Sequence, residues 1–265
     1  MNGGITLVTK KKVLLVGETW VTAATHTKGF DLFHTATQHS GAGPLLAALA
    51  DSDFAVEHMS AQDCSEAFPL TLEGLEGYDA IILSDIGTNT FLLHPDVWLH
   101  GKPVPNRLKL IRERTAGGGG LVMIGGYLTF QGIDGKARWR RTPVEAALPV
   151  ECLPFDDRLE IPEGFRADVV NASHPLVRGI PEPWPLLLGA NEVIARTRAD
   201  CEVVVRLPNS EGGHPLLVCG TWGEGRSVAW TSDVGPHWAP VEFTNWAGYR
   251  TLWSNVLSWV TRSGD

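Results

Sequence analysis

Short runs of mostly apolar residues, separated by segments with helical periodicity, predict the central strands of an α/β sheet. The strand-like runs cover residues 13–16, 54–59, 78–86 and 121–124. The first of them has no polar alternation, which is typical of a parallel strand covered on both faces. Helices are expected at 44–50, which begins with proline, and at 106–115, which four glycines end. This β-α-β-β-α-β order predicts right-handed crossovers and a doubly wound sheet.

The second half of the chain predicts an antiparallel extension of that sheet. Three strand-like runs follow one another closely, at 201–207, 214–220 and 225–231. Prolines are frequent between 149 and 185, so we expect irregular or edge structure there. The closing segment 245–261 spaces its aromatic residues as a helix does, and we expect that stripe to face the core or another copy. The expected fold is a flavodoxin-like, mostly parallel, doubly wound sheet with a C-terminal antiparallel extension, in a single domain covering 1–265.

Composition narrows the classes of function. The formal net charge of the 265 residues is −8, which gives no reason to expect nucleic acid or an anionic membrane as a partner. Cys64, Cys152, Cys201 and Cys219 lie far apart and form no CxxC pair, so free and mostly buried thiols are expected. No apolar run approaches the length of a membrane span and no signal peptide is visible. We therefore predict a cytoplasmic protein.

A pair of glycines after the run 121–124 marks the point around which the chain is organised. Gly125 and Gly126 allow a sharp turn at the end of a central strand, where α/β domains collect ligands and reacting groups. An elbow of this kind usually presents a serine or cysteine nucleophile. Here it presents Tyr127, and Gln131 follows it.

The segment 231–240 is the strongest local candidate for chemistry. It runs from a predicted strand into Asp233, and a Gly-Pro turn then presents His237 and Trp238. An aspartate and a histidine together could perform acid–base chemistry, and the tryptophan could stack on a substrate. The alternative is that Asp233 caps local turns while His237 and Trp238 pack against the terminal helix.

Three histidines, His26, His34 and His39, lie in the long loop that we expect after the first strand. Metal sites are built from imidazoles and carboxylates on converging backbone, and spacings of eight and five residues match no known ligand pattern. A loop that leans over the strand ends and lines a pocket is the preferred interpretation. No metal or cofactor is expected.

Three motifs and the order of elements resemble the class I glutamine amidotransferase-like fold, and in particular its uncharacterised glutamine amidotransferase-like group. The motifs are Ser84-Asp-Ile-Gly-Thr-Asn-Thr-Phe91, Gly125-Gly-Tyr-Leu-Thr-Phe-Gln-Gly132 and Ser232-Asp-Val-Gly-Pro-His-Trp238. Amidotransferases carry an elbow Gly-x-Cys-x-Gly-x-Gln, whose cysteine attacks the glutamine amide. Gly125 and Gln131 match the first and last positions of that elbow, but Tyr127 replaces the cysteine and Thr129 the second glycine. The resemblance therefore implies the fold, and the substitution predicts that thiol-dependent glutamine hydrolysis is absent.

The sequence leads to three hypotheses for function. The first is a small polar ligand bound at the strand carboxyl ends, with Glu18, Asp85, Gly125, Gly126, Gln131 and Trp238 as ligand-binding residues. If the protein is an enzyme, a hydrolase for instance, His237 is the acid–base residue, with Asp233 orienting it and Tyr127 beside it, and amides after Gly126 could stabilise an oxyanion. The second is a non-catalytic oligomerisation or carbohydrate-associated module, since ten tryptophans suit large apolar contacts, and we expect a homo-oligomer. The third is a metal-dependent hydrolase that uses the loop histidines.

Overall fold

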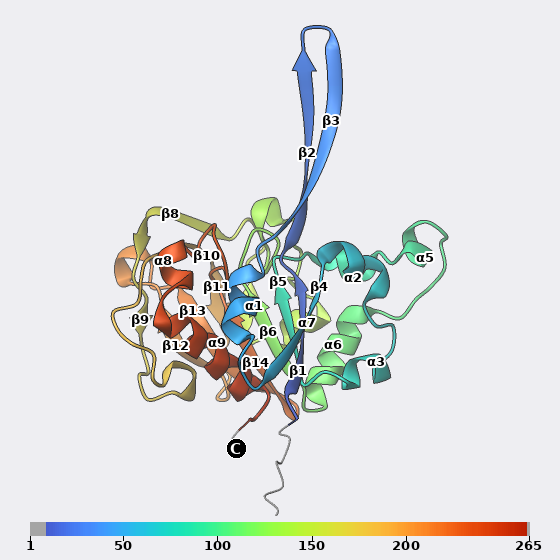
Figure 1. The fold of residues 1–265 in the computed structure, drawn as a ribbon. Helices are drawn as coiled ribbons and strands as arrows, with labels where there is room; N and C mark the ends of the chain where they lie inside the picture. Colours follow the sequence, from blue (N-terminus) through green and yellow to red (C-terminus); the bar gives the residue numbers. More distant parts are fainter. Residues whose placement is uncertain (1–8, 264–265) are drawn as a thin grey trace, which may run out of the picture.

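The computed structural model describes residues 9–263 and arranges them around one eight-stranded sheet (Figure 1). Five parallel strands lie side by side in the order β4 (Phe54–Met59), β1 (Lys11–Gly17), β5 (Ala80–Ser84), β6 (Gly120–Ile124) and β14 (Gly225–Trp230). Three antiparallel strands continue the sheet from β14, namely β13 (Pro215–Trp222), β12 (Glu202–Arg206) and β9 (Asp168–Val169). Numbered along the chain, the parallel strands follow the order 2-1-3-4-5 of flavodoxin-like sheets. The predicted fold class and its antiparallel extension are confirmed.

The sheet separates two hydrophobic cores because successive side chains of a strand point to opposite faces. On β1, Val13 and Leu15 face one core, and Leu14 and Val16 face the other. The first core packs against α1 (Gly43–Leu49) and α9 (Ala247–Val260). The second packs against α2 (Ala61–Ala67), α3 (Glu73–Glu76), α6 (Arg107–Ala116) and α7 (Pro143–Ala147). Burial on both faces explains why the strand sequences are continuously apolar.

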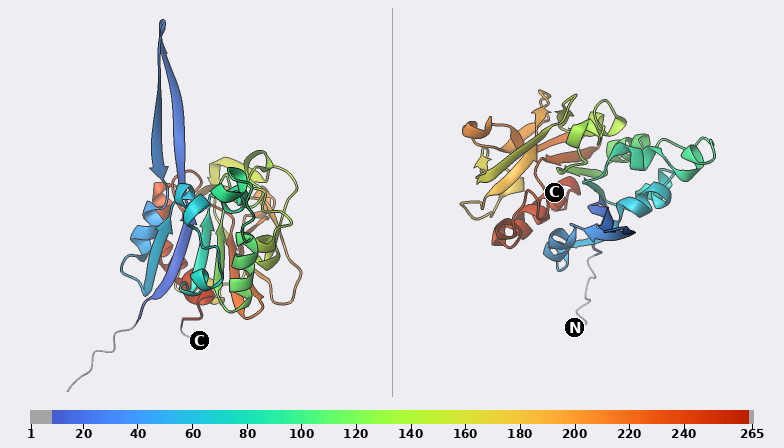
Figure 2. Two further views of the ribbon diagram at one scale, coloured as in Figure 1. Left: turned by 90° about the vertical axis from the view of Figure 1, so that its right-hand side faces the viewer. Right: turned by 90° about the horizontal axis from the view of Figure 1, so that it is seen from above.

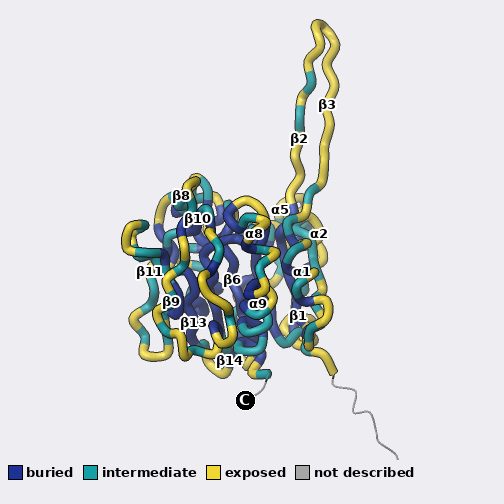
Figure 3. Tube along the Cα trace, turned by 60° about the vertical axis from the view of Figure 1, so that its left-hand side comes forward, coloured by how far each residue is buried: buried dark blue, intermediate teal, exposed yellow. Residues whose placement is uncertain are grey.

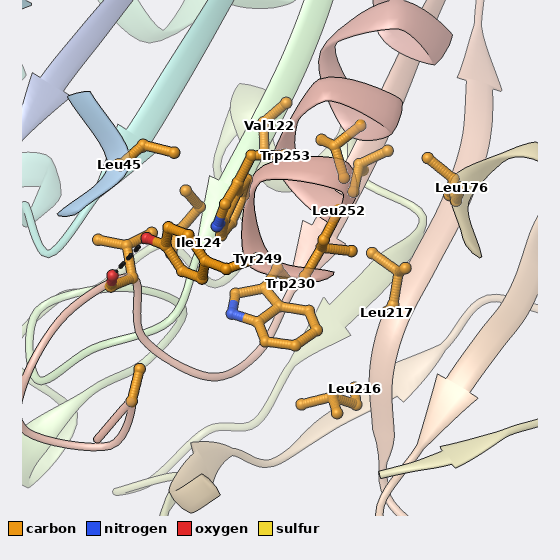
Figure 4. Packing of buried hydrophobic residues seen from close by; sticks show 14 of the residues in the cluster. Leu45, Val122, Ile124, Leu176, Leu216, Leu217, Trp230, Tyr249, Leu252 and Trp253 are labelled. Atoms are coloured by element: carbon orange, nitrogen blue, oxygen red, sulfur yellow. Dashed lines mark hydrogen bonds between the residues drawn. The ribbon is translucent and has the colours of Figure 1, made fainter. Parts of the chain in front are cut away.

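The aromatic stripe of the closing helix lies in the first core (Figure 4). Tyr249, Leu252 and Trp253 of α9 are buried beside Trp230 of β14. The Tyr249 hydroxyl donates to the carbonyl of Val234, 2.5 Å away, so the polar end of this buried ring has a partner. The prediction that this stripe belongs to the core is confirmed.

The remaining elements lie outside the eight-stranded sheet. They are β2 (Thr19–Lys28), β3 (Asp31–Ser40), α4 (Thr88–Leu92), α5 (Pro95–Trp98), the 3-10 helices η1 (Ile133–Gly135), η2 (Pro175–Val177) and η3 (Asn209–Glu211), β7 (Val150–Cys152), β8 (Arg158–Phe165), β10 (Leu187–Asn191), β11 (Val193–Ala195) and α8 (Val241–Thr244). Two small sheets pair β10 with β8 and β11 with β7. The proline-rich region, expected to be irregular or edge structure, contains the eight-residue edge strand β8.

The segment after the first strand corrects one expectation. Residues 19–40 do not form a loop; β2 and β3 pair as an antiparallel hairpin, which we call the arm. The arm projects away from the body in two perpendicular views (Figures 1 and 2). It buries almost nothing against its own chain (Figure 3). Its strands have no apolar face directed at a core, and the apolar alternation that reveals most half-buried strands is therefore missing.

A second correction concerns the connection from the second to the third predicted strand. Two short helices, α2 and α3, lie between β4 and β5. Ser60 caps α2 by accepting a hydrogen bond from the Asp63 amide, 3.0 Å away. A helical crossover is what two parallel strands in one sheet require, so the β-β step in the predicted order was wrong.

Candidate functional site

A cavity of about 420 Å³ opens at the carboxyl ends of the parallel strands. This is where ligands bind in open α/β sheets, in particular where the strand order reverses, which here is between β1 and β5. Three acidic residues and one histidine face it together with apolar and aromatic groups. The lining residues are Glu18, Trp20, Gly41, Asp85, Tyr127, Leu128, Ile133, Asp233, Pro236 and His237.

Glu18 follows β1 directly and is buried at the floor of the cavity. Its backbone is left-handed (φ 56°), and its Oε2 accepts a hydrogen bond from the Ser84 hydroxyl at 2.5 Å. Gly41 makes room for it, since a Cβ there would lie 2.5 Å from Glu18 Oε1. Burial raises the pKa of Glu18 well above its usual value, and the charges of Asp233 and Asp85 raise it further. Glu18 therefore holds its proton at pH values where an exposed glutamate has lost it.

Asp85 follows β5 and reaches across to the elbow. Its Oδ1 accepts a hydrogen bond from the Leu128 amide at 2.7 Å, and the Tyr127 amide also bonds to this carboxylate. Burial nevertheless raises the pKa of Asp85 from 3.8 to about 6, because desolvation outweighs these two hydrogen bonds. The amides that we expected to be free for an oxyanion are thus occupied by a carboxylate of the same chain.

Asp233 and His237 lie on the loop that follows β14. The nearest approach between them is 3.7 Å, from His237 Nδ1 to Asp233 Oδ2. The other oxygen, Asp233 Oδ1, accepts from the amide of Val234 at 2.6 Å. The His237 side chain remains 35% exposed, and its Nε2 lies 3.9 Å from Glu160 Oε2. Asp233 therefore caps its turn with one oxygen, as the alternative expected, while its other oxygen faces His237 at a distance longer than a hydrogen bond.

Tyr127 stands at the elbow position, with its ring edge-on to His237 at a centroid distance of 4.3 Å. The Arg158 guanidinium lies over the ring, 4.9 Å from its centroid. Partial burial, and after it the neighbouring Glu160 carboxylate, raises the pKa of the Tyr127 phenol. A phenol that keeps its proton is a hydrogen-bond donor and a poor nucleophile. The sequence did not indicate Arg158 or Glu160, because both lie on β8, in the region expected to be irregular or edge structure.

Four of the residues predicted to bind a ligand do not line the cavity. Trp238 is buried, with its indole N–H donating to Glu160 Oε2 at 3.0 Å and its ring stacked against His237. The backbones of Gly125 and Gly126 pack closely, and a Cβ on Gly125 would lie 2.1 Å from the Thr231 carbonyl oxygen. The amide of Gln131 donates to Asp157, and its side chain faces Gly135. These four residues shape and support the site around Tyr127.

The elbow loop, residues 125–132, is held in place by a buried pair, Asp157 and Asn191. The sequence did not indicate these two residues. Asp157 accepts from the amides of Gln131 at 2.7 Å and Gly132 at 2.9 Å. Asn191 donates to Asp157 at 2.8 Å, and its side-chain oxygen accepts from the Gly126 amide at 2.9 Å. The Gly126 amide is therefore also engaged. Nothing near these two residues in the sequence distinguishes them from ordinary loop and strand residues.

The cysteines lie elsewhere. All four are free, and Cys64, Cys152 and Cys219 are buried, as expected. Burial raises the pKa of Cys64 and of Cys219 to about 12. Cys219 Sγ lies 3.5 Å from His174 Nε2, but His174 Nδ1 accepts from the Leu176 amide, so Nε2 carries the proton and cannot deprotonate the thiol. Burial also raises the pKa of Cys201, and none of the four cysteines lines the cavity.

The loop histidines do not converge. His26 and His34 lie on neighbouring cross-strand pairs of the arm, so their side chains point to opposite faces. His39 stacks on Trp20 at the base of the arm, and five residues of strand place it about 17 Å from His34. In residues 9–263 no group of three His, Cys, Asp or Glu side chains could hold a metal ion. The geometry does not support the metal-dependent hydrolase.

Comparison with known proteins places this geometry in a family. The cytoplasmic protein STM3548 from Salmonella typhimurium is 40% identical, with a TM-score of 0.88 over 94% of this chain and 98% of that one. The cytoplasmic protein STM1381 from Salmonella typhimurium LT2 is also 40% identical, with a TM-score of 0.87 over 94% and 99%. A search of curated proteins found no match. In the part of the chain that the structure describes, no helix is long and apolar enough to cross a membrane.

The family model described as "Putative glutamine amidotransferase" matches residues 12–262, which include the elbow and every residue that lines the cavity. The chain belongs to this glutamine amidotransferase-like family.

Proposed function

We propose that this protein binds a small polar ligand, neutral or positively charged, in the cavity at the strand ends, and that His237 and the carboxyl groups exchange protons with it. The observation that carries the proposal is the convergence of Glu18, Asp85, Asp233 and His237 on one cavity. Their side chains come from loops after three different strands, β1, β5 and β14. Convergence of titratable groups at the switch point of an α/β sheet is typical of a ligand site.

The charged residues that line the cavity indicate which class of ligand it can bind. Three of the ten lining residues are acidic, and none is lysine or arginine. An anionic group such as a phosphate would face the carboxylates of Asp85 and Asp233 with no lysine or arginine in the lining, which disfavours its binding. A hydroxyl or an ammonium group can instead donate hydrogen bonds to the carboxylates. A polyol or an amine therefore fits the cavity better than a nucleotide or an organic acid.

The protonation states suit acid–base chemistry near neutral pH. Burial raises the pKa of Glu18 well above its usual value and places the pKa of Asp85 at about 6. A carboxyl that keeps its proton beside one that loses it gives a site both an acid and a base. His237 is the exposed member, so it is the group that first meets a ligand entering the cavity.

The site lacks the cysteine nucleophile and the free backbone amides that glutamine hydrolysis by a thiol requires. Tyr127 stands where the cysteine nucleophile would be, and no cysteine lines the cavity in the described part of the chain. The backbone amides of Gly126, Tyr127 and Leu128 already have partners. We therefore propose that the protein does not hydrolyse glutamine through a thiol. We also place it in the cytoplasm, in line with the descriptions of STM3548 and STM1381.

Calorimetric titration with chemical probes tests this proposal. The probes are neutral polyols, simple polyamines, inorganic phosphate and glutamine, each at pH 5, 7 and 9. We expect a polyol or an amine to bind, and Asp85→Asn and His237→Ala to weaken that binding at least tenfold. The control Glu163→Gln changes an exposed acid on β8 and should leave binding unchanged.

Two results would refute the proposal. One is preferential binding of phosphate, and the other is binding that both cavity substitutions leave intact. Release of ammonia from glutamine that stops on thiol alkylation would overturn the claim about the mechanism. The alternative of an assembly module is favoured by a different observation, the projecting arm.

A further inference from the structure

The arm is a two-stranded ribbon that its own chain leaves uncovered. Each strand has ten residues, so the arm is about 34 Å long. Its base is fixed, because the Thr19 hydroxyl donates to Gln62 at 2.9 Å and accepts from the Ala61 amide at 2.8 Å. Beyond the base, the hydrogen bonds and ring contacts found for residues 20–39 within the described chain stay inside the arm.

An isolated two-stranded hairpin is at best marginally stable in water. The arm nevertheless exposes apolar side chains toward its tip: Phe30 is fully exposed, Leu32 is 57% exposed and Phe33 45%. Natural edge strands are usually protected by charge or proline. Here Lys28 and Asp31 are the charged residues of β2 and β3, they face each other across the strands, and neither strand contains proline. Both edges of the ribbon are therefore open for pairing.

We propose that the arm binds a second copy of this chain and that two copies exchange arms around a two-fold axis. The receiving surface is the end of the body from which the arm emerges. Exposed apolar side chains lie there on the elbow loop (Leu128) and around α5 (Leu93, Trp98 and Leu99). Because a two-fold interface uses the same surfaces on both copies, each body supplies one arm and receives one.

The available area favours a second copy over a different partner. One face of a ribbon 34 Å long and two strands wide measures about 340 Å². An unrelated partner that covers this face would bury about 700 Å² in total, which is below the roughly 1,000 Å² of a stable biological interface. Reciprocal exchange doubles the buried area to about 1,400 Å², within the standard range.

The chemistry of the arm excludes two other classes of partner. Nucleic acids and anionic membranes attract clusters of lysine and arginine. The arm carries one lysine, and the opposing Asp31 balances it. A nearly neutral ribbon with threonine, alanine and aromatic side chains suits a protein surface, and two such ribbons do not repel each other.

Sedimentation velocity of the full chain tests the proposal. We expect the wild-type protein to sediment with twice the mass of one chain at micromolar concentration. The triple variant Phe30→Ser, Leu32→Ser, Phe33→Ser should raise the dimer dissociation constant about 100-fold or more. Replacement of residues 21–38 by Asn-Gly should give a monomer with unchanged far-ultraviolet circular dichroism of the body. The control Val170→Ser removes an exposed apolar side chain beside β9, at the opposite edge of the sheet, and should leave the mass unchanged.

Hydrogen exchange gives an independent readout. The amides of residues 20–39 should be protected at high protein concentration and lose that protection on dilution or in the triple variant. A wild-type protein that is monomeric at about 100 µM would overturn the proposal. An armless variant that still forms the dimer would overturn it too, as would arm protection that does not depend on concentration. None of these readouts involves a ligand, so they are distinguishable from failure of the proposed ligand site.

Discussion

The buried carboxyl of Asp85 gives the sharpest quantitative prediction. Substitution Asp85→Asn keeps the shape of the side chain and a hydrogen-bond acceptor for the Leu128 amide. Asparagine also tolerates the left-handed backbone (φ 42°) at this position. The main change is therefore the loss of a group that can ionise.

The magnitude follows from the pKa of Asp85, which burial raises from 3.8 to about 6. The folded protein holds this proton more tightly than the unfolded chain, so stability is lost as the pH rises from about 4 to about 6. The full loss corresponds to about 3 kcal/mol. The substitution removes it, and we expect the free energy of unfolding of Asp85→Asn, relative to wild type, to rise by about 3 kcal/mol between pH 4 and pH 8.

Urea unfolding of both proteins at half-unit pH steps measures this difference. Asp156→Asn is the matched control with the opposite sign, because the ion pair with Arg158 holds the pKa of Asp156 below its usual value. Asp156 therefore stabilises the fold at neutral pH and loses that effect in acid. We expect Asp156→Asn to be less stable than wild type at pH 7, with the difference disappearing in acid. A constant difference between Asp85→Asn and wild type across this range would refute the reasoning.

Three further predictions concern packing and the thiols. Gly125→Ala places a Cβ 2.1 Å from the Thr231 carbonyl oxygen, and we expect chemical denaturation to show a loss above about 3 kcal/mol. The control Gly43→Ala meets nothing within 4 Å and should be neutral or slightly stabilising. Trp253→Ala empties the centre of the first core and should cost about 3–5 kcal/mol; thermal unfolding unchanged from wild type would contradict the packing. In the native protein, iodoacetamide should modify Cys201 first, because Cys64, Cys152 and Cys219 are buried. Mass spectrometry showing equal native rates at all four would refute this.

The central sheet could be predicted because its strands are continuous apolar runs. The run Val13–Val16 is apolar throughout, since helices cover both of its faces. The helix 106–115 was found within one residue, because Asn106 caps it and Gly117 ends it. Local signals were sufficient where local structure and burial agree.

The arm could not be predicted from the sequence. The arm has no side facing a core, so its sequence shows no alternation to detect, and only its β-branched threonines and the turn at Gly29 hint at a hairpin. β8 is an edge strand in the region where prolines predicted irregular or edge structure, but the sequence did not indicate where the strand begins and ends. Within the candidate site, Asp85, Asp233 and His237 were found because each follows a recognisable strand or turn. Asp157 and Asn191 act through contacts across 34 residues of chain, which no local pattern records.

The carboxylate of Asp85 also bears on how this fold can change its chemistry in evolution. The elbow amides that would meet a developing negative charge in acyl transfer already bond to the Asp85 carboxyl group. A single Tyr127→Cys change would therefore place a thiol beside an anion site that is filled, and loss of Asp85 alone would empty the site with no thiol to use it. A thiol route at this elbow would therefore need both changes together.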